Sequence, residues 1–375
     1  MKILFTCGGT AGHINPAVAL ARMFQERNEG CEVLFVGADN GMEMQLVPRE
    51  GYEIRTVTIS SFYRSLSFSA LKHNLGTLRN LQRSQKQAKR ILDNFQPDLV
   101  VGTGGYASYP VVSAAAKRGI PTAVHESNAV PGLTTKMLSK HVDRVMVGFE
   151  ESRQYYSDPD RVVVTGTPVR GDFFDLTREE ARAKLGITDD RPVVVTTWGS
   201  LGAQVMNEHM IGFVKLEVQD GQPFHHIYGV GKRYYQRVSA GIAEAGIDLT
   251  QVPDVDVREY IYDMPVVMAA ADLTIDRAGA STISEITALA KPSILVPSPN
   301  VTNNHQEKNA RVLESKGGAV LLLEKDCTPE LLYQTTRALL DDPDRRAEMT
   351  KALRSMQTED AAEKIYETLC NLIRT

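Results

Sequence analysis

Short apolar runs alternate with longer amphipathic stretches through the first half of the chain. The runs are rich in β-branched residues and predict buried strands at 3–7, 32–36, 54–59, 98–102, 121–125, 144–148 and 162–166. Because helical stretches separate most of these runs, the pattern predicts βαβ units and a parallel, doubly wound sheet. The first helix is expected to begin at Pro16 with Asn15 as its N-cap, since proline favours the first helical position.

The same pattern begins again in the second half of the chain. Residues 192–207 again combine a strand, a turn of small residues and a helix, and further strands are predicted at 225–229, 255–260, 273–276, 293–297 and 319–323. Residues 343–374 are expected to be helical throughout. We therefore predict two α/β Rossmann-like domains that face each other across a cleft, 1–166 and 167–375, with the last helices able to cross back to the first domain.

Composition narrows the class of protein. The apolar fraction of 42% and the charged fraction of 23% are ordinary for a soluble globular protein, and the net charge of -4 argues against a general nucleic-acid partner. The four cysteines show no C-x-x-C pair, so reduced thiols in a cytosolic protein are expected. No signal peptide and no apolar run long enough to span a membrane is recognised.

A glycine-rich segment, Gly8 to His13, follows the first predicted strand. Small residues let the backbone approach a ligand and leave N–H groups free for phosphate or hydroxyl oxygens. His13 would then lie where a general base near neutral pH is useful. A tight turn with a structural histidine explains the same residues equally well.

Residues 102–107 fit the G-x-G-x-x-A fingerprint of dinucleotide-binding domains, with Glu126 about one βα unit later. That match favours an NAD-dependent oxidoreductase. The fingerprint usually opens a domain, however, and here it lies in the middle of one, so an ordinary turn between strand and helix is preferred. His125 to Asn128 form a polar cluster that would suit sugar hydroxyls, or a polar loop in which Glu126 caps the next helix.

Three segments of the second half have the character of ligand loops. Residues 198–203 precede a helix, whose N-terminus favours anions and where Ser200 could donate to a diphosphate or simply act as an N-cap. In 276–285, Thr282 and Glu285 fit a T-x-x-E capping box, so Glu285 is either a cap or a ribose ligand. Residues 303–309 are rich in amides and charges, as in a binding loop or a solvated helix start.

Metal chemistry has weak support in the sequence. Asp254 and Asp256 spell the D-x-D signature of metal-dependent sugar transferases, but they adjoin a predicted strand after Pro253 and are interpreted as surface residues. No H-E-x-x-H, G-x-S-x-G or Walker A motif is present, which weakens protease, esterase and NTPase interpretations. We expect no metal and no cofactor.

Together and in order, these segments resemble one family. GGTAGHINPAVALA, GGYASYPVVSAA, IPTAVHESNAVPGLTTK, GTPVR, GSLGA, RAGASTISEI and NNHQEKNA are similar to the successive motifs of the MurG family of N-acetylglucosaminyltransferases, over residues 1 to about 320. The resemblance implies the GT-B fold. It also implies inverting transfer of N-acetylglucosamine from UDP-GlcNAc to the C4 hydroxyl of the muramoyl sugar of lipid I, giving lipid II for peptidoglycan synthesis.

The resemblance also implies roles for individual residues. His13 matches the proposed base, Glu285 the ribose ligand, and Ile261 a backbone contact to uracil. The remaining matches are substrate-binding positions for the donor sugar, diphosphate and ribose: Thr10, Ala11, Gly12, Asn128, Arg170, Ser200, Ala280, Ser281, Thr282, Ile283, Ser284 and Gln306. Two positions depart from the family pattern, since Ala11 and Trp198 each replace a glycine, and a bulky Trp198 puts the path of its loop in doubt.

The segment 55–92 contains no Asp or Glu and carries eight Lys or Arg residues among aromatic and aliphatic ones. This combination is typical of an interfacial surface, and an acceptor that is a membrane lipid gives it a use. We therefore expect a peripheral protein on the cytoplasmic side of the cell membrane, docked on anionic lipid. The residues expected to face the membrane are Phe62, Tyr63, Arg64, Phe68 and Lys72.

Other functions stay open at this point. A GT-B glycosyltransferase acting on another glycolipid or a natural product would keep the fold and change the acceptor. A sugar-nucleotide epimerase would turn over UDP-GlcNAc without any acceptor, and an oxidoreductase would bind NADH. A non-catalytic glycan-binding scaffold would share the loops without turnover.

Overall fold

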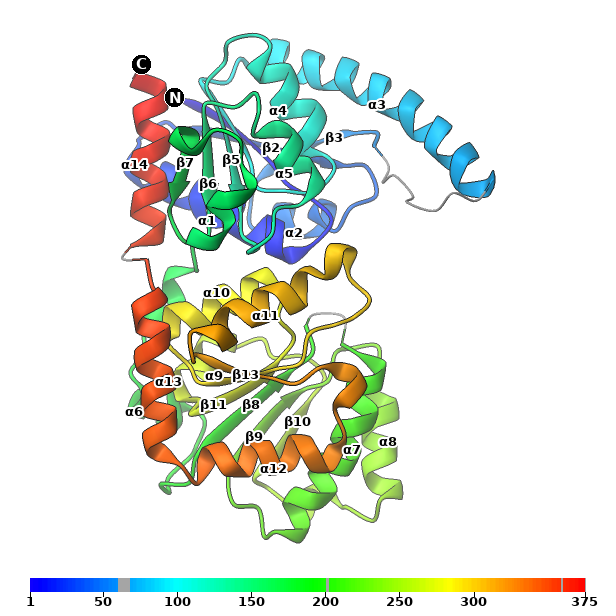
Figure 1. Ribbon diagram of the computed structural model, residues 1–375, viewed down its shortest axis with the longest axis vertical. Helices are drawn as coiled ribbons and strands as arrows, with labels where there is room; N and C mark the ends of the chain where they lie inside the picture. Colours follow the sequence, from blue (N-terminus) through cyan, green and yellow to red (C-terminus); the bar gives the residue numbers. More distant parts are fainter. Residues whose placement is uncertain (60–67, 200–201, 359, 375) are drawn as a thin grey trace. The chain divides into compact units, whose positions relative to one another are not determined.

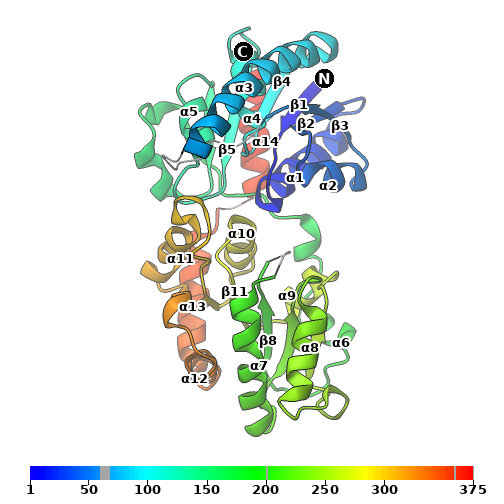
Figure 2. The ribbon, with the colours of Figure 1, turned by 90° about the vertical axis from the view of Figure 1, so that its right-hand side faces the viewer.

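The computed structural model describes residues 1–59, 68–199, 202–358 and 360–374. Its chain divides into two compact units. Unit 1 consists of Met1–Val169 together with Thr358–Thr375, and unit 2 consists of Arg170–Gln357. Each unit is a parallel β-sheet with helices on both faces, as Figures 1 and 2 show.

Unit 1 contains a seven-stranded sheet of order β3-β2-β1-β4-β5-β6-β7, in which all neighbouring strands are parallel. The strands are β1 (Lys2–Thr6), β2 (Glu32–Ala38), β3 (Glu53–Val57), β4 (Leu99–Gly102), β5 (Thr122–Glu126), β6 (Arg144–Val147) and β7 (Val162–Val164). The helices of the unit are α1 (Ala11–Arg27), α2 (Glu43–Arg49), α3 (Phe68–Phe95), α4 (Ser108–Ala116), α5 (Leu133–Leu138) and α14 (Ala361–Arg374).

Alternate residues of the strands in unit 1 build two separate cores. Ile3 and Phe5 pack with α1 and α14 on one face, whereas Leu4 packs with α3 and α4 on the other. This alternation follows from the period of two in a β-strand. Because both faces are covered, the strands are apolar on both sides, which explains the continuous apolar runs in the sequence.

Unit 2 contains a six-stranded parallel sheet of order β10-β9-β8-β11-β12-β13. Its strands are β8 (Val193–Thr197), β9 (His225–Gly229), β10 (Val255–Arg258), β11 (Leu273–Asp276), β12 (Ser293–Leu295) and β13 (Ala319–Leu321). Its helices are α6 (Arg178–Lys184), α7 (Gln204–Gln219), α8 (Tyr235–Glu244), α9 (Met264–Ala270), α10 (Ala280–Leu289), α11 (His305–Ser315), α12 (Pro329–Leu340) and α13 (Pro343–Met356).

Short 3-10 turns complete the two units. They are η1 (Glu150–Tyr155), η2 (Pro159–Arg161), η3 (Gly171–Phe174), η4 (Leu249–Gln251), η5 (Thr302–Asn304) and η6 (Glu324–Asp326).

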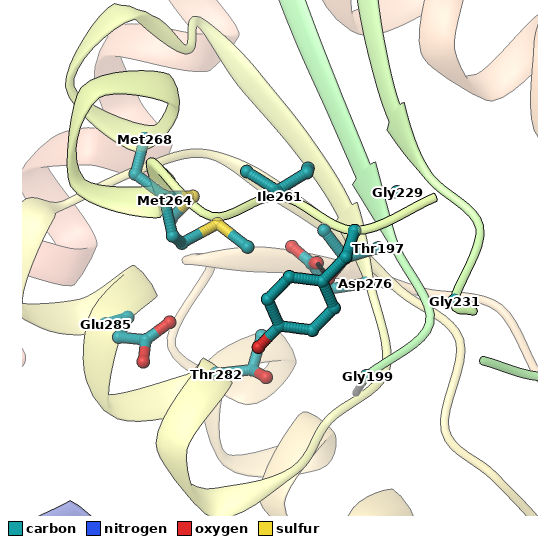
Figure 3. Close-up of a pocket in the computed structure, with 11 residues that line it drawn as sticks. Thr197, Gly199, Gly229, Gly231, Ile261, Met264, Met268, Asp276, Thr282 and Glu285 are labelled. Carbon is teal, nitrogen blue, oxygen red and sulfur yellow. Dashed lines mark hydrogen bonds between the residues drawn. The ribbon is translucent and has the colours of Figure 1, made fainter. Parts of the chain in front are cut away.

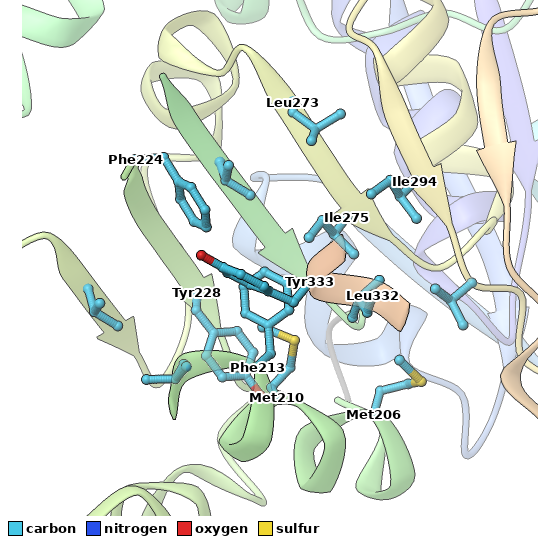
Figure 4. Packing of buried hydrophobic residues seen from close by; sticks show 14 of the residues in the cluster. Met206, Met210, Phe213, Phe224, Tyr228, Leu273, Ile275, Ile294, Leu332 and Tyr333 are labelled. Atoms are coloured by element: carbon cyan, nitrogen blue, oxygen red, sulfur yellow. The ribbon is translucent and has the colours of Figure 1, made fainter. Parts of the chain in front are cut away.

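The largest core of unit 2 lies between its sheet and the helices α7, α8 and α12. Phe213 of α7 meets Tyr333 of α12 edge to face, with ring centroids 5.3 Å apart, and Tyr228 of β9 is fully buried beside them (Figure 4). Close-packed aromatic side chains of this kind hold the strands in a fixed register. The carboxyl ends of these strands, where the loops begin, are therefore firmly placed.

Two expectations about helix boundaries are wrong. Helix α1 begins at Ala11, not at Pro16, and Thr10 is its N-cap, so Pro16 lies inside the helix. The helix starts earlier because the glycine turn ends at Thr10, and its first turn is closed by bonds from His13 N and Ile14 N to the Thr10 carbonyl. The C-terminal region is also not helical throughout, since α13 ends at Met356 and α14, which belongs to unit 1, begins at Ala361.

In the described part of the chain, no helix has the length and apolar character required to cross a lipid bilayer.

Candidate functional site

The two sheets share one strand order. In each sheet, the order in which successive strands are added reverses beside the first strand of the unit. In unit 1 the reversal lies between β1 and β4, and in unit 2 it lies between β8 and β11. Ligands of open α/β sheets bind outside the carboxyl ends of the strands at such switch points. The loops after these four strands are therefore the first place to look for a site.

In unit 1 the loops after β1 and β4 pack directly on each other. A Cβ on Gly105 would lie 2.3 Å from the carbonyl oxygen of Gly8, and a Cβ on Gly104 would lie 2.5 Å from the ring of His13. Both glycines also have positive φ, which other residues rarely adopt. Gly104 of the apparent dinucleotide fingerprint and its neighbour Gly105 thus serve this close contact between the two loops.

His13 lies in the first turn of α1 and is held in one tautomer. Its Nδ1 is 2.8 Å from the carbonyl oxygen of Gly8, which can only accept a hydrogen bond. Nδ1 therefore carries the proton, and Nε2 keeps the lone pair that a general base needs. The hydroxyl of Thr103 donates to the His13 carbonyl at 2.6 Å and so holds the first turn of α1 against the loop after β4.

A second group in this loop system was missed by the sequence analysis. Glu43, at the start of α2, is fully buried, and its carboxylate accepts from Gly9 N at 3.0 Å and from Ala38 N at 2.8 Å. The signal in the sequence was weak, since a glutamate at a helix start is ordinarily a solvated residue that favours the helix dipole. Its burial depends on chain segments that come together only in the fold.

The cluster at His125 to Asn128 is mostly occupied with protein contacts. The side chain of His125 is buried and bonds the carbonyl of Gly166 at 2.9 Å through Nε2, and burial lowers its pKa. Glu126 is also buried, and its carboxylate accepts from Gly132 N and from the side-chain amide of Asn128. His125 and Glu126 therefore shape the loop, while Asn128 is half-buried with its amide oriented by Glu126.

Unit 2 carries a pocket at its switch point. Figure 3 shows the residues that line it, which come from the ends of β8, β9 and β11, from the loop after β10, and from α9 and α10. They are Thr197, Gly199, Gly229, Gly231, Tyr260, Ile261, Met264, Met268, Asp276, Thr282 and Glu285. An apolar wall of methionine and isoleucine faced by a few polar groups is typical of a small-molecule site.

Two carboxyl groups face this pocket. Asp276 is buried, with one oxygen accepting from the Thr197 hydroxyl at 2.5 Å, while its other oxygen has no hydrogen-bond partner among the described residues. Burial raises the pKa of Asp276 to about 6. Burial, and then the negative charge of Asp276, raise the pKa of Glu285 to about 8, although the positive charge of Arg170 opposes that rise.

The capping-box interpretation of Thr282 and Glu285 is wrong. Helix α10 begins at Ala280 with Gly279 as its N-cap, so Thr282 and Glu285 lie inside the helix. The Gly279 cap makes no side-chain hydrogen bond, which leaves the first N–H groups of the helix available. The hydroxyl of Ser281 is also buried without a partner among the described residues, whereas that of Ser284 bonds the Ala280 carbonyl.

The side chain of Trp198 is buried in the core. Its side chain is 3% exposed and belongs to the main core of unit 2, with the guanidinium of Arg277 over its ring. Gly199 then turns the chain with φ of 76°. Ser200 lies outside the described residues.

The remaining predicted positions have simple surroundings. Ile261 is buried beside Gly229 and lines the pocket. Arg170 is exposed, and its Nη2 lies 3.4 Å from Oδ2 of Asp172. Gln306 lies in the first turn of α11, where its carbonyl oxygen accepts from Ser298 N at 2.8 Å.

The D-x-D aspartates are held by basic partners. Asp254 pairs with Arg191 and His225, and Asp256 pairs with Arg258. Asp254 is thus bound into a partly buried ion-pair network and is not a plain surface residue.

Most of the residues expected to face the membrane lie outside the part of the chain that the structure describes. Phe62, Tyr63 and Arg64 lie outside the described residues, and so do the side chains of Phe68 and Lys72. Further along α3, the side chains of Arg83, Lys86, Lys89 and Arg90 are exposed, while those of Ala88, Ile91 and Leu92 are in the core.

Comparisons with known proteins agree along the whole chain. Residues 3–147 match the glycosyltransferase family 28 N-terminal domain, and residues 193–365 match the family 28 C-terminal domain. A relative from Acetivibrio thermocellus, named UDP-N-acetylglucosamine--N-acetylmuramyl-(pentapeptide) pyrophosphoryl-undecaprenol N-acetylglucosamine transferase, is 43% identical over 100% of this chain and 99% of its own length.

Solved structures show the same fold. The crystal structure of Acinetobacter baumannii MurG matches with a TM-score of 0.76 and 26% identity over 99% of both chains. A UDP-GlcNAc 2-epimerase from Neisseria meningitidis bound to UDP-GlcNAc has a TM-score of 0.67 at 16% identity, over 99% of this chain and 100% of its own. At that identity the epimerase shows a shared fold alone.

Two Rossmann-like units, each with a glycine-containing loop at its switch point, place the protein among the glycosyltransferases of GT-B fold. Within that class, the chain belongs to glycosyltransferase family 28 and, inside it, to the MurG family of N-acetylglucosamine transferases. The resemblance seen in the sequence motifs is confirmed.

Proposed function

We propose that this chain transfers N-acetylglucosamine from UDP-GlcNAc to the C4 hydroxyl of the muramoyl sugar of lipid I, with inversion, to give lipid II. The observation that carries the proposal is the pocket at the switch point of unit 2, with an apolar wall, Glu285 and the uncapped N-terminus of α10 around it. The relatives named for this transfer cover the full length of the chain.

Unit 2 holds the donor in this proposal. The backbone at Ile261 contacts uracil, Glu285 accepts from the ribose hydroxyls, and the N-terminus of α10, from Ala280 to Ser284, meets the diphosphate. When the bond to the sugar breaks, negative charge grows on the leaving UDP. Unpaired backbone N–H groups at a helix N-terminus stabilise such charge without reorganisation.

Further donor contacts come from residues outside that helix. Arg170 and Ser200 act near the diphosphate, and Asn128 and Gln306 act on sugar hydroxyls, together with the turn of Thr10, Ala11 and Gly12. Asn128 is suited to this role because the carboxylate of Glu126 fixes the direction of its amide.

In unit 1, His13 takes the proton from the attacking hydroxyl. The tautomer supports this role, because the Gly8 carbonyl accepts from Nδ1–H and leaves Nε2 as the proton acceptor. General-base catalysis by a positioned histidine contributes about 10²–10⁴-fold to the rate.

The test of the activity is an assay with radiolabelled UDP-GlcNAc and a lipid I analogue, scored for disaccharide. Labelled disaccharide that forms only when the acceptor is present is the expected result. Release of UDP or formation of an epimer without any acceptor would support an epimerase, and transfer to other glycolipids but not to the lipid I analogue would support a different acceptor.

Membrane docking through the basic segment 55–92 is part of the same proposal. The exposed Arg83, Lys86, Lys89 and Arg90 extend the run of positive charge along α3. Each basic residue near an anionic leaflet contributes about 1 kcal/mol. Co-sedimentation with anionic vesicles should exceed that with neutral ones, and a triple variant, Phe62→Ser, Phe68→Ser and Lys72→Glu, should lose the difference. Equal binding by the parent and the triple variant would rule the docking surface out.

A further inference from the structure

The carboxylate of Glu43 occupies a space that three glycines leave for it. A Cβ on Gly8, Gly37 or Gly41 would lie 2.5, 2.4 or 2.2 Å from atoms of the Glu43 side chain. These glycines come from the loop after β1, from β2 and from the turn before α2. The absence of side chains at these three positions therefore leaves space for one carboxylate in the interior of unit 1. Burial of a carboxylate costs free energy unless the group is hydrogen-bonded.

Both oxygens of this carboxylate accept hydrogen bonds from backbone. Oε2 accepts from Gly9 N at 3.0 Å and Oε1 accepts from Ala38 N at 2.8 Å. These two N–H donors fix the position of the carboxylate. The negative charge of Glu43 also acts on the Cys7 thiol, just after β1. Burial is the main cause of the raised pKa of Cys7, and the charge of Glu43 is the second.

Glu43 and His13 bond to the two ends of the same peptide group. Gly9 N–H bonds Glu43, and the Gly8 carbonyl joined to that nitrogen accepts from Nδ1 of His13 at 2.8 Å. A carboxylate on the N–H side of a peptide polarises it and makes its carbonyl oxygen a stronger acceptor. A stronger acceptor on Nδ1–H favours the imidazolium form of the ring.

We propose that Glu43 is a positioning residue that sets the orientation and proton affinity of His13 through the Gly8–Gly9 peptide. The arrangement resembles a carboxylate–histidine pair in which a peptide group stands between the two partners. Gly105 leaves room for the Gly8 carbonyl, since a Cβ there would lie 2.3 Å from its oxygen. The inference rests on the proposed role of His13 as base.

The test is Glu43→Gln, which keeps the shape of the side chain and removes its charge. The midpoint of the His13 titration, followed by NMR of the imidazole carbons with His13→Ala to assign the signal, should move to lower pH by about 0.5 to 1 unit. The acid limb of the pH–rate profile should move the same way, and the plateau rate should fall about 3- to 10-fold. The KM for UDP-GlcNAc should change less than the plateau rate, because the pocket lined by Ile261 and Glu285 belongs to unit 2.

Two controls separate this role from simple loss of structure. Glu32→Gln changes an exposed glutamate on β2 and should leave the titration unchanged. Glu43→Asp keeps the charge but is too short to reach both amides, and its midpoint should lie between those of the parent and Glu43→Gln. If Glu43→Gln does not fold, as judged by thermal melting, Glu43→Asp decides alone, and a midpoint equal to the parent's overturns the proposal.

A double variant distinguishes this inference from the proposed function. With His13→Ala already present, Glu43→Gln should lower the rate no further, since the two residues act as one unit. A further fall of similar size in that background would overturn the link. If His13→Ala itself retains turnover, the base assignment fails, while the NMR titration still reports whether Glu43 acts on the ring.

Discussion

Both units have a buried carboxyl group near the carboxyl ends of their strands, but the surroundings of the two groups differ. In unit 1, both oxygens of Glu43 accept hydrogen bonds from backbone, one from Gly9 N in the loop after β1 and one from Ala38 N at the end of β2. In unit 2, Asp276 has one oxygen without a partner among the described residues, and the pKa values of Asp276 and Glu285 are raised to about 6 and about 8.

The difference separates two uses of one residue type. A fully buried carboxylate that is bonded to backbone amides is a fixed part of the loop and is not exposed to a ligand. A carboxyl group in a pocket with open hydrogen-bonding capacity is unfavourable until a ligand fills it, and such groups gather at functional sites. This difference supports the proposal that Glu43 positions the base in unit 1 and that the pocket of unit 2 contributes to donor recognition.

The largest effect that this division predicts is on turnover. His13→Ala should lower the rate by about 10²–10⁴-fold, because the transferred proton loses its acceptor. The affinity for UDP, measured by calorimetry, should be nearly unchanged, and His141→Ala, an exposed histidine of the same unit, should have the parent rate. A variant within a few-fold of the parent rate would contradict the base assignment.

A substitution in unit 2 should instead lower the affinity for the donor. Glu285→Ala should weaken UDP-GlcNAc binding by about 0.5–1.5 kcal/mol, since it removes a hydrogen-bonding group from the ribose. Calorimetric titration measures this directly, with Glu244→Ala on the exposed side of α8 as the control. Glu285 lies inside α10 and caps nothing, so a fall in melting temperature with unchanged donor affinity would argue for a packing role instead.

The smallest effect concerns stability and pH. In the unfolded chain the pKa values of Asp276 and Glu285 return to about 3.8 and 4.5, so the folded state holds protons that the unfolded state has lost. Stability is therefore greatest below the unfolded values and declines as pH rises through about 6 and then about 8. Between pH 6 and pH 8.5 the melting temperature should fall by about 2–4 °C.

Glu285→Gln is the matched variant for this pH effect. It should melt with a smaller difference between the two pH values, while Glu43→Gln should leave the difference as it is in the parent. The same pH difference in Glu285→Gln as in the parent would show that the raised pKa belongs to some other group.

The sequence predicted most strands closely, because a strand buried on both faces must be apolar along its whole length. The strands β9 and β11 have the predicted ends, and the others differ from the prediction by a few residues. Helix starts were harder, as α1 shows, since Pro16 is tolerated inside the helix and the turn of Gly8 and Gly9 sets its beginning. The capping box at Thr282 failed for the same reason, because the turn at Gly279 decided where α10 begins.

What the sequence determined by itself is the class of fold, the order of its motifs and the family to which they belong. Apolar periodicity and glycine turns are local properties, and they can be read without knowing which segments meet. The tertiary structure alone decided that Glu43 lies under the Gly8–Gly9 peptide, that Trp198 points into the core, and that Asp276 and Glu285 face one pocket. These facts depend on burial and on partners distant along the chain, and a carboxyl group's role follows from what surrounds it.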